Sequence, residues 1–92
     1  MSEAVDRLRK QVIEKALHGP GKASGDARRA AFDNKDAGPL VDKVAQNALK
    51  VTDEDIKQAG KSDDEIFELV VCASLGQADR QLDAALAALE QA

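Results

Sequence analysis

The chain has 92 residues, a formal net charge of −4 and a pI near 4.9, so broad attraction to nucleic acid or to an anionic membrane is not expected. Its single cysteine cannot form an internal disulfide, which is typical of a reducing compartment, and no segment approaches the roughly 18 apolar residues of a membrane span. We therefore expect one soluble, cytoplasmic domain over residues 1–92, with no nucleic-acid partner and no membrane partner.

The composition favours helices. Alanine, the best helix former, occurs 17 times, whereas Trp and Tyr are absent. No segment alternates apolar and polar residues as a half-buried strand does. The predicted fold class is all-α, a small bundle of about four to five helices over about residues 3–18, 26–34, 39–50, 53–59 and 63–90.

The first predicted helix covers about residues 3–18, with the hydroxyl of Ser2 as its cap. Its apolar residues recur at the spacing of one buried stripe: Val5, Leu8, Val12, Ile13 and Leu17. His18, Gly19 and Pro20 end the helix, because a cation-capable residue suits its negative end and proline cannot continue it.

Residues 19–25, GPGKASG, hold three glycines and a proline and are predicted to form a loop. The glycines suggest a phosphate cradle, but the P-loop spacing is missing and no strand precedes the segment. Pro20 also removes one of the amides that such a cradle would use. We interpret the segment as a flexible connector.

The second predicted helix, about residues 26–34, is capped near Ser24 or Asp26 and places several alanines on one side. Arg28 and Arg29 form the only adjacent arginine pair in the chain. With acidic residues nearby, the pair is interpreted as part of a solvated helix face.

Three further helix starts follow. Pro39 suits the first position of a helix over residues 39–50. The other two are capping boxes, in which a hydroxyl and an acid three residues later each bind the other's backbone amide: Thr52 with Asp55, and Ser62 with Glu65. Gly60 lies between these two helices, where a left-handed residue commonly ends the first of them.

The segment from Ile66 to Leu75 is the most apolar in the chain and is broken only by Glu68 and Ser74. A helix that is apolar nearly all round is enclosed on several sides, and a chain this small has few helices of its own for that purpose. We therefore expect contacts between subunits to complete the enclosure. After it, Gly76 allows either one long helix with a close contact at the glycine or two nearly collinear pieces.

No catalytic residue, cofactor or metal site is predicted. His18 is explained by its position at a helix end, with no Cys, Asp or Glu three or four residues later as a second ligand. Cys72 lies in the apolar run, where burial raises the pKa of a thiol and suppresses its reactivity. The acids of residues 63–65 point in different directions on a helix and are better explained as capping residues. A redox role for Cys72 stays open as an alternative.

Residues 52–56 (TDEDI), 59–69 (AGKSDDEIFEL) and the Ala/Val-rich helix that continues through Gly76 resemble the C-terminal portion of alkylhydroperoxidase D-like proteins, the carboxymuconolactone decarboxylase superfamily. The resemblance covers roughly residues 40–90. It implies an all-helical subunit that assembles with copies of itself through its helices.

The peroxidases of that family carry a glutamate, then a Cys-x-x-Cys about a dozen residues later, then a histidine. In this sequence, neither cysteine of the pair nor the histidine is found at the corresponding distance from either glutamate that could match. Counting from Glu65, the corresponding positions hold Gln77, Arg80 and Ala84, and counting from Glu68 they hold Arg80, Asp83 and Ala87. No catalytic residue is therefore transferred from the family.

Two functions of different classes follow. The first is a small alkylhydroperoxidase D-like protein that forms a homo-oligomer through its apolar helices and lacks thiol peroxidase activity. The second is a helical adaptor that receives a partner protein's helix on a near-heptad stripe. That stripe comprises Ala78, Leu82, Ala85, Leu86 and Leu89.

Overall fold

The computed structural model describes residues 3–91 and contains, over that range, helices and no strand. The elements are α1 (Glu3–His18), α2 (Gly25–Asp33), α3 (Pro39–Asn47), the short 3₁₀ helix η1 (Ala48–Lys50), α4 (Asp53–Gln58) and α5 (Asp63–Gln91). The all-α prediction of a small bundle is therefore confirmed. Ser2, the predicted cap of the first helix, lies outside the described residues.

The capping residues mark the starts of α2, α4 and α5 as predicted. The Ser24 hydroxyl accepts a hydrogen bond from the Ala27 amide at 3.0 Å, so Ser24 caps α2. Both capping boxes form, with Thr52 and Asp55 bonded reciprocally at the start of α4 and the Ser62 and Glu65 pair at the start of α5. The third predicted helix is shorter than expected, because Asn47 leaves the helical backbone (φ −161°, ψ 85°) and the chain tightens into η1.

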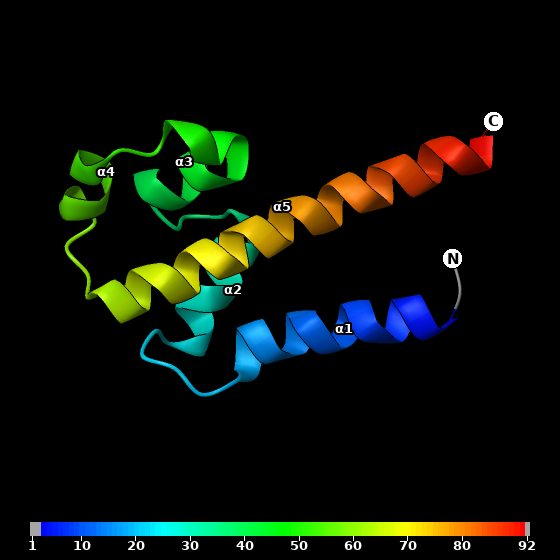
Figure 1. Ribbon diagram of the computed structural model, residues 1–92, viewed down its shortest axis with the longest axis horizontal. Coiled ribbons are helices and arrows are strands. Elements are labelled where there is room, and N and C mark those ends of the chain that lie inside the picture. Colours follow the sequence, from blue (N-terminus) through cyan, green and yellow to red (C-terminus); the bar gives the residue numbers. More distant parts are fainter. Residues whose placement is uncertain (1–2, 92) are drawn as a thin grey trace.

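The long helix α5 is the centre of the fold (Figure 1). Its first half packs against α2 and α3, whereas its second half extends away from them beside α1. The first turn of α1 and the last turn of α5 lie at the same end of the molecule, so α1 and α5 run in opposite directions (Figure 1). The core joins side chains from these four helices and the loop before α2: Leu17, Ala23, Ala31, Phe32, Leu40, Val41, Val44, Ile66, Leu69, Cys72 and Ala73.

At Gly76 the backbone of α2 comes close to α5. A Cβ atom at this position would lie 1.9 Å from the Phe32 carbonyl oxygen, so only glycine allows the contact. The helix continues unbroken through Gly76, which confirms the first of the two alternatives for this segment. Arg80, one turn later, donates to the same carbonyl at 2.7 Å and so satisfies a backbone acceptor at the end of α2.

The burial predicted for the first helix is wrong in part. In α1 only Leu17 is fully buried and Ile13 partly so, whereas Val12 and Leu8 are exposed, the latter at 61%. In α5 the chain itself encloses one side of the apolar run, and Phe67 on the other side is 70% exposed, so the expected enclosure by further subunits stays a prediction. The reason is common to both helices: the chain supplies neighbours for one face of each and none of its described residues covers the other.

Candidate interaction surface

Cys72, the residue considered for redox chemistry, is part of the core. Cys72 is 1% exposed, and its thiol donates to the Ala16 carbonyl at 3.4 Å. Burial raises the pKa of the Cys72 thiol, the nearby Glu68 charge adds to the increase, and the positive charge of Arg28 opposes it. A thiol held neutral in a core is a poor nucleophile, as the sequence predicted.

His18 is the last residue of α1, and its side chain is mostly exposed, with Nε2 3.7 Å from a Glu14 carboxylate oxygen. Among residues 3–91, no group of three or more His, Cys, Asp or Glu side chains is placed to hold a metal ion. The acids of residues 63–65 occupy the first turn of α5, where they oppose the positive end of the helix dipole.

The glycine-rich loop between α1 and α2 does bind an anion, but the anion is the chain's own Glu68 carboxylate. Glu68 of α5 accepts hydrogen bonds from the Lys22 amide at 2.7 and 2.9 Å and from the Ala23 amide at 3.0 Å. Gly21 makes this possible, because a Cβ there would overlap the Glu68 carboxylate. Sequence reasoning described the loop as a flexible connector and missed this contact.

Arg28 corrects another prediction, since it is buried rather than part of a solvated face. One guanidinium nitrogen donates to the Gly19 carbonyl at 2.7 Å, while Nε is buried with no hydrogen-bond partner among the described residues. Arg29 does lie at the surface, where it forms an ion pair with Asp33 at 3.0 Å. The sequence held one clue: Arg28 shares a helix face with the buried Ala31 and Phe32.

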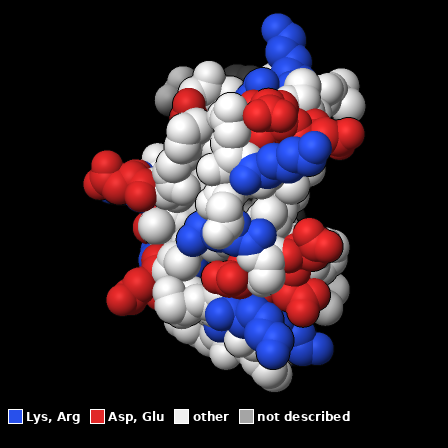
Figure 2. Space-filling model, turned by 90° about the vertical axis from the view of Figure 1, so that its left-hand side faces the viewer, with Lys and Arg blue, Asp and Glu red and all other residues white. Residues whose placement is uncertain are grey.

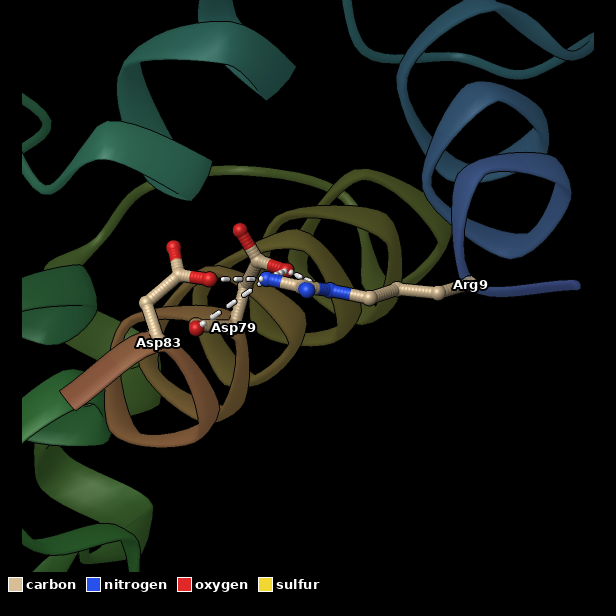
Figure 3. A network of polar contacts seen from close by, with 3 residues as sticks. All are labelled: Arg9, Asp79 and Asp83. Atoms are coloured by element: carbon tan, nitrogen blue, oxygen red, sulfur yellow. Dashed lines mark hydrogen bonds and ion pairs between the residues drawn. The ribbon is translucent and has the colours of Figure 1, made fainter. Parts of the chain in front are cut away.

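The second half of α5 is tied to α1 by one arginine and two acids (Figure 3). Arg9 donates to an Asp79 carboxylate oxygen at 2.6 Å and to an Asp83 carboxylate oxygen at 2.7 Å. These contacts, that with Asp83 foremost, raise the pKa of Arg9 above its ordinary value, so the charge persists at any working pH. The pair Asp79 and Asp83 thus fixes the position of α1 along α5.

Beside this polar contact lies an apolar groove between the two helices, with a volume of about 220 Å³. It is lined by Arg9, Val12, Ile13, Leu75, Ala78, Asp79 and Leu82. The exposed side chains of Leu8 and Val12 continue it on the α1 side. The groove therefore belongs to a wider apolar surface rather than to an enclosed site.

The other side of that surface is the exposed face of α5, which we call the α5 stripe. Its members lie on one side of the helix, because they are three or four residues apart: Phe67, Val71, Ser74, Ala78, Leu82, Ala85 and Leu89. Phe67 and Leu89, at its ends, are 70% and 71% exposed. The stripe includes most of the Ala78–Leu89 stripe predicted from sequence and extends it by almost three turns toward the start of the helix.

Beyond its first turn, α5 has no charged residue on this face. After Glu68 the helix carries four charged residues, which a helical projection places within one arc of about 100° on the opposite side. They are Asp79, Arg80, Asp83 and Glu90. By contrast, Figure 2 shows Lys and Arg interspersed with Asp and Glu over the end of the molecule that carries α4 and the beginning of α5. An exposed helix face without charge is unusual for a solvated helix and is typical of an interface.

No protein-family model matches the chain, and neither a curated protein nor a solved structure is significantly similar to it. In the part of the chain that the structure describes, no helix is both long enough and apolar enough to cross a membrane.

Proposed function

We propose that this chain is a small cytoplasmic subunit similar to alkylhydroperoxidase D-like proteins, that it assembles with copies of itself through α1 and α5, and that it has no thiol peroxidase activity. The observation that carries the proposal is the charge-free, exposed face of α5 with Phe67 and Leu89 at its ends. Removing such a face from water stabilises an assembly by about 25 cal/mol for each Å² of apolar surface.

The proposed lack of peroxidase activity is supported by the residues at the family's thiol positions and by the burial of Cys72. Counting from Glu68, the positions of the family's reactive thiol pair hold Arg80, bonded to a backbone carbonyl, and Asp83, bonded to Arg9. Counting from Glu65, they hold Gln77 and Arg80, which are hydrogen-bonded to each other. Cys72 is buried and lies four residues from Glu68, on the side of α5 that faces the Ala16 carbonyl.

Two measurements test the proposal. The mass of the purified chain in solution, by light scattering, is expected to be a multiple of 9.8 kDa. Consumption of an alkyl hydroperoxide in the presence of a dithiol reductant is expected to match the rate without protein. A monomer at high concentration would contradict the assembly, and turnover that Cys72→Ser abolishes would contradict the lack of peroxidase activity.

The groove between α1 and α5 favours a second candidate, an adaptor that binds an amphipathic helix of another protein. Under this reading the chain alone is a monomer. A fluorescent leucine-rich helical peptide should then bind saturably, and Leu82→Lys, which places a charge in the groove, should remove the binding. A multimeric mass without peptide binding would reject the adaptor.

A further inference from the structure

The α5 stripe has a symmetric spacing. Its seven members follow one another at intervals of four, three, four, four, three and four residues, which read the same from either end of the helix. Ala78 is the central member. Phe67 and Leu89 lie equally far from it, as do Val71 and Ala85, and likewise Ser74 and Leu82.

In a two-fold contact between identical chains, if residue i of one copy meets residue j of the other, then residue j of the first copy also meets residue i of the second. Such a contact therefore requires this kind of symmetric spacing. Two α5 helices that run in opposite directions and cross at Ala78 bring each stripe member opposite its counterpart. The predicted opposing pairs are Ala78 with Ala78, Ser74 with Leu82, Val71 with Ala85, and Phe67 with Leu89.

The sizes of the opposing side chains are complementary. Near the crossing a large side chain meets a small one, Leu82 against Ser74 and Val71 against Ala85, which is how well-packed helix pairs fill space. Ala78 meets itself at the crossing point, where the axes come closest and small side chains permit that approach. The large side chains of Phe67 and Leu89 pair at the ends of the contact. Two helices that cross at about 20° are farther apart there and leave room for both side chains.

Charge does not oppose such a contact, although the whole chain is acidic with a net charge of −4. Like charges repel two copies of an acidic protein, but the repulsion is strongest between groups at the interface. The α5 stripe has no charged member, and Asp79 and Asp83, which lie toward α1, are already bonded to Arg9.

The surface area of the chain is large enough for a stable dimer. The chain exposes 6511 Å², whereas a compact monomer of 9.8 kDa exposes about 5,200 Å². The excess of about 1,300 Å² exceeds the roughly 800 Å² that each partner buries in an interface of standard size. The radius of gyration, 14.3 Å, likewise exceeds the about 12 Å expected of a compact domain of this length.

We propose that two copies of this chain pair α5 against α5 in antiparallel orientation, with the two-fold axis at Ala78 and the exposed flank of α1, Leu8 and Val12, covering the edge of the partner's helix. This inference rests on the self-assembly proposed above and specifies its geometry. The dimer core is then four helices, α1 and α5 from each copy.

Cysteine cross-linking tests the axis. In Ala78→Cys the two new thiols face each other across the axis, so mild oxidation should convert most of the protein to a disulfide-linked dimer. In the matched control, Ala85→Cys, the two thiols lie about 21 Å apart along the helices and should form no dimer. The double variant Val71→Cys/Ala85→Cys should link again, because these positions oppose each other. The wild type, whose Cys72 is buried, controls for the native thiol.

A charge substitution tests the face without oxidation. Ala85→Glu places a carboxylate on the stripe and is expected to halve the mass in solution while helical circular dichroism is unchanged. Ala87→Glu makes the same change two residues away on the exposed opposite side and should leave the mass as in the wild type.

The results of these experiments distinguish failure of the antiparallel α5 pairing from failure of self-assembly as a whole. A multimeric wild type in which Ala78→Cys does not link, or links no faster than Ala85→Cys, overturns the antiparallel pairing and leaves self-assembly standing. Loss of the multimer in both glutamate variants also overturns the assignment to this face. A wild type that is monomeric at high concentration overturns both.

Discussion

Two residues of α5, Gly76 and Arg80, contact the carbonyl oxygen of Phe32. Gly76 allows it to approach the helix backbone, and Arg80 donates to it at 2.7 Å. The end of α2 is therefore held by one close contact and one charge-assisted hydrogen bond, which is stronger than a neutral one.

Gly76→Ala is expected to destabilise the protein, although the same change normally favours a helix by about 1 kcal/mol. The new Cβ would overlap the backbone of Phe32, so α2 and α5 must separate, at a cost of about 1–3 kcal/mol. Gly25→Ala, where nothing lies within 4 Å of the added atom, is the control and should change the urea midpoint little. Equal midpoints for the two variants would contradict the close contact.

Asp55 joins α3 to α4. Its carboxylate accepts from Lys43 of α3 at 2.7 Å and from the Thr52 amide at 2.9 Å. The hydrogen bond from Lys43, foremost, and that from Thr52 hold the pKa of the Asp55 carboxyl below its ordinary value of 3.8. Folding thus favours the deprotonated form of Asp55, and this contribution to stability is present above the unfolded pKa.

The contribution is lost as the pH falls from about 4 through the lowered pKa of the folded state. We expect the difference in free energy of unfolding between the wild type and Asp55→Asn to be largest at neutral pH and to shrink below about pH 4. Urea titrations between pH 7 and pH 3 measure it. Lys43→Met removes the main cause and should weaken this pH dependence; a difference that does not vary with pH would disprove the linkage.

At the scale of whole elements, the loop between α1 and α2 is fastened to α5 through Glu68. Glu68→Ala removes the carboxylate that accepts hydrogen bonds from the Lys22 and Ala23 amides. The Ala23 amide belongs to a buried residue, and a buried donor without a partner lowers the free energy of unfolding by about 1–3 kcal/mol. Hydrogen exchange at both amides should accelerate in this variant. Glu68→Gln keeps one acceptor oxygen and should lose less; unchanged exchange in both variants would show that the loop does not need the contact.

The helices could be predicted from sequence to within a few residues because their ends are determined locally. Ser24, Thr52 and Ser62 each bind an amide three residues away, and Gly60 takes the left-handed backbone (φ 66°) that ends α4. Such contacts need no knowledge of the rest of the fold.

Burial could not be predicted as well, because it depends on which helices meet. In α1, Leu8 and Val12 are four residues apart and share an exposed side, whereas Leu17 lies on the opposite side from Leu8 and is the only one of the three that reaches the core. The contact of Glu68 with a loop 45 residues earlier also leaves no local signal apart from Gly21. The candidate interaction surface was therefore predicted as two separate segments, the apolar run from Ile66 to Leu75 and the stripe from Ala78 to Leu89, and their continuity on one face of a single helix was not predicted.

At the scale of the whole molecule, α1 and the second half of α5 project from the remaining helices (Figure 1). A chain that buries this projection against a copy of itself is stabilised by mass action.

The thermal midpoint of the wild type is therefore expected to rise with protein concentration, whereas that of Ala85→Glu should not. Differential scanning calorimetry over a hundredfold range of concentration measures both. Wild-type midpoints that are independent of concentration would argue that each chain reaches its full stability alone.

Because the Glu68 carboxylate accepts from two amides of the glycine-rich loop, these amides are not available to an anion from solution. The amides of Lys22 and Ala23 are directed at an acceptor that belongs to the same molecule, so phosphate or sulfate in the buffer finds them already occupied. A segment whose composition suggests a binding loop for an external anion is in this chain bonded to a carboxylate of the same molecule.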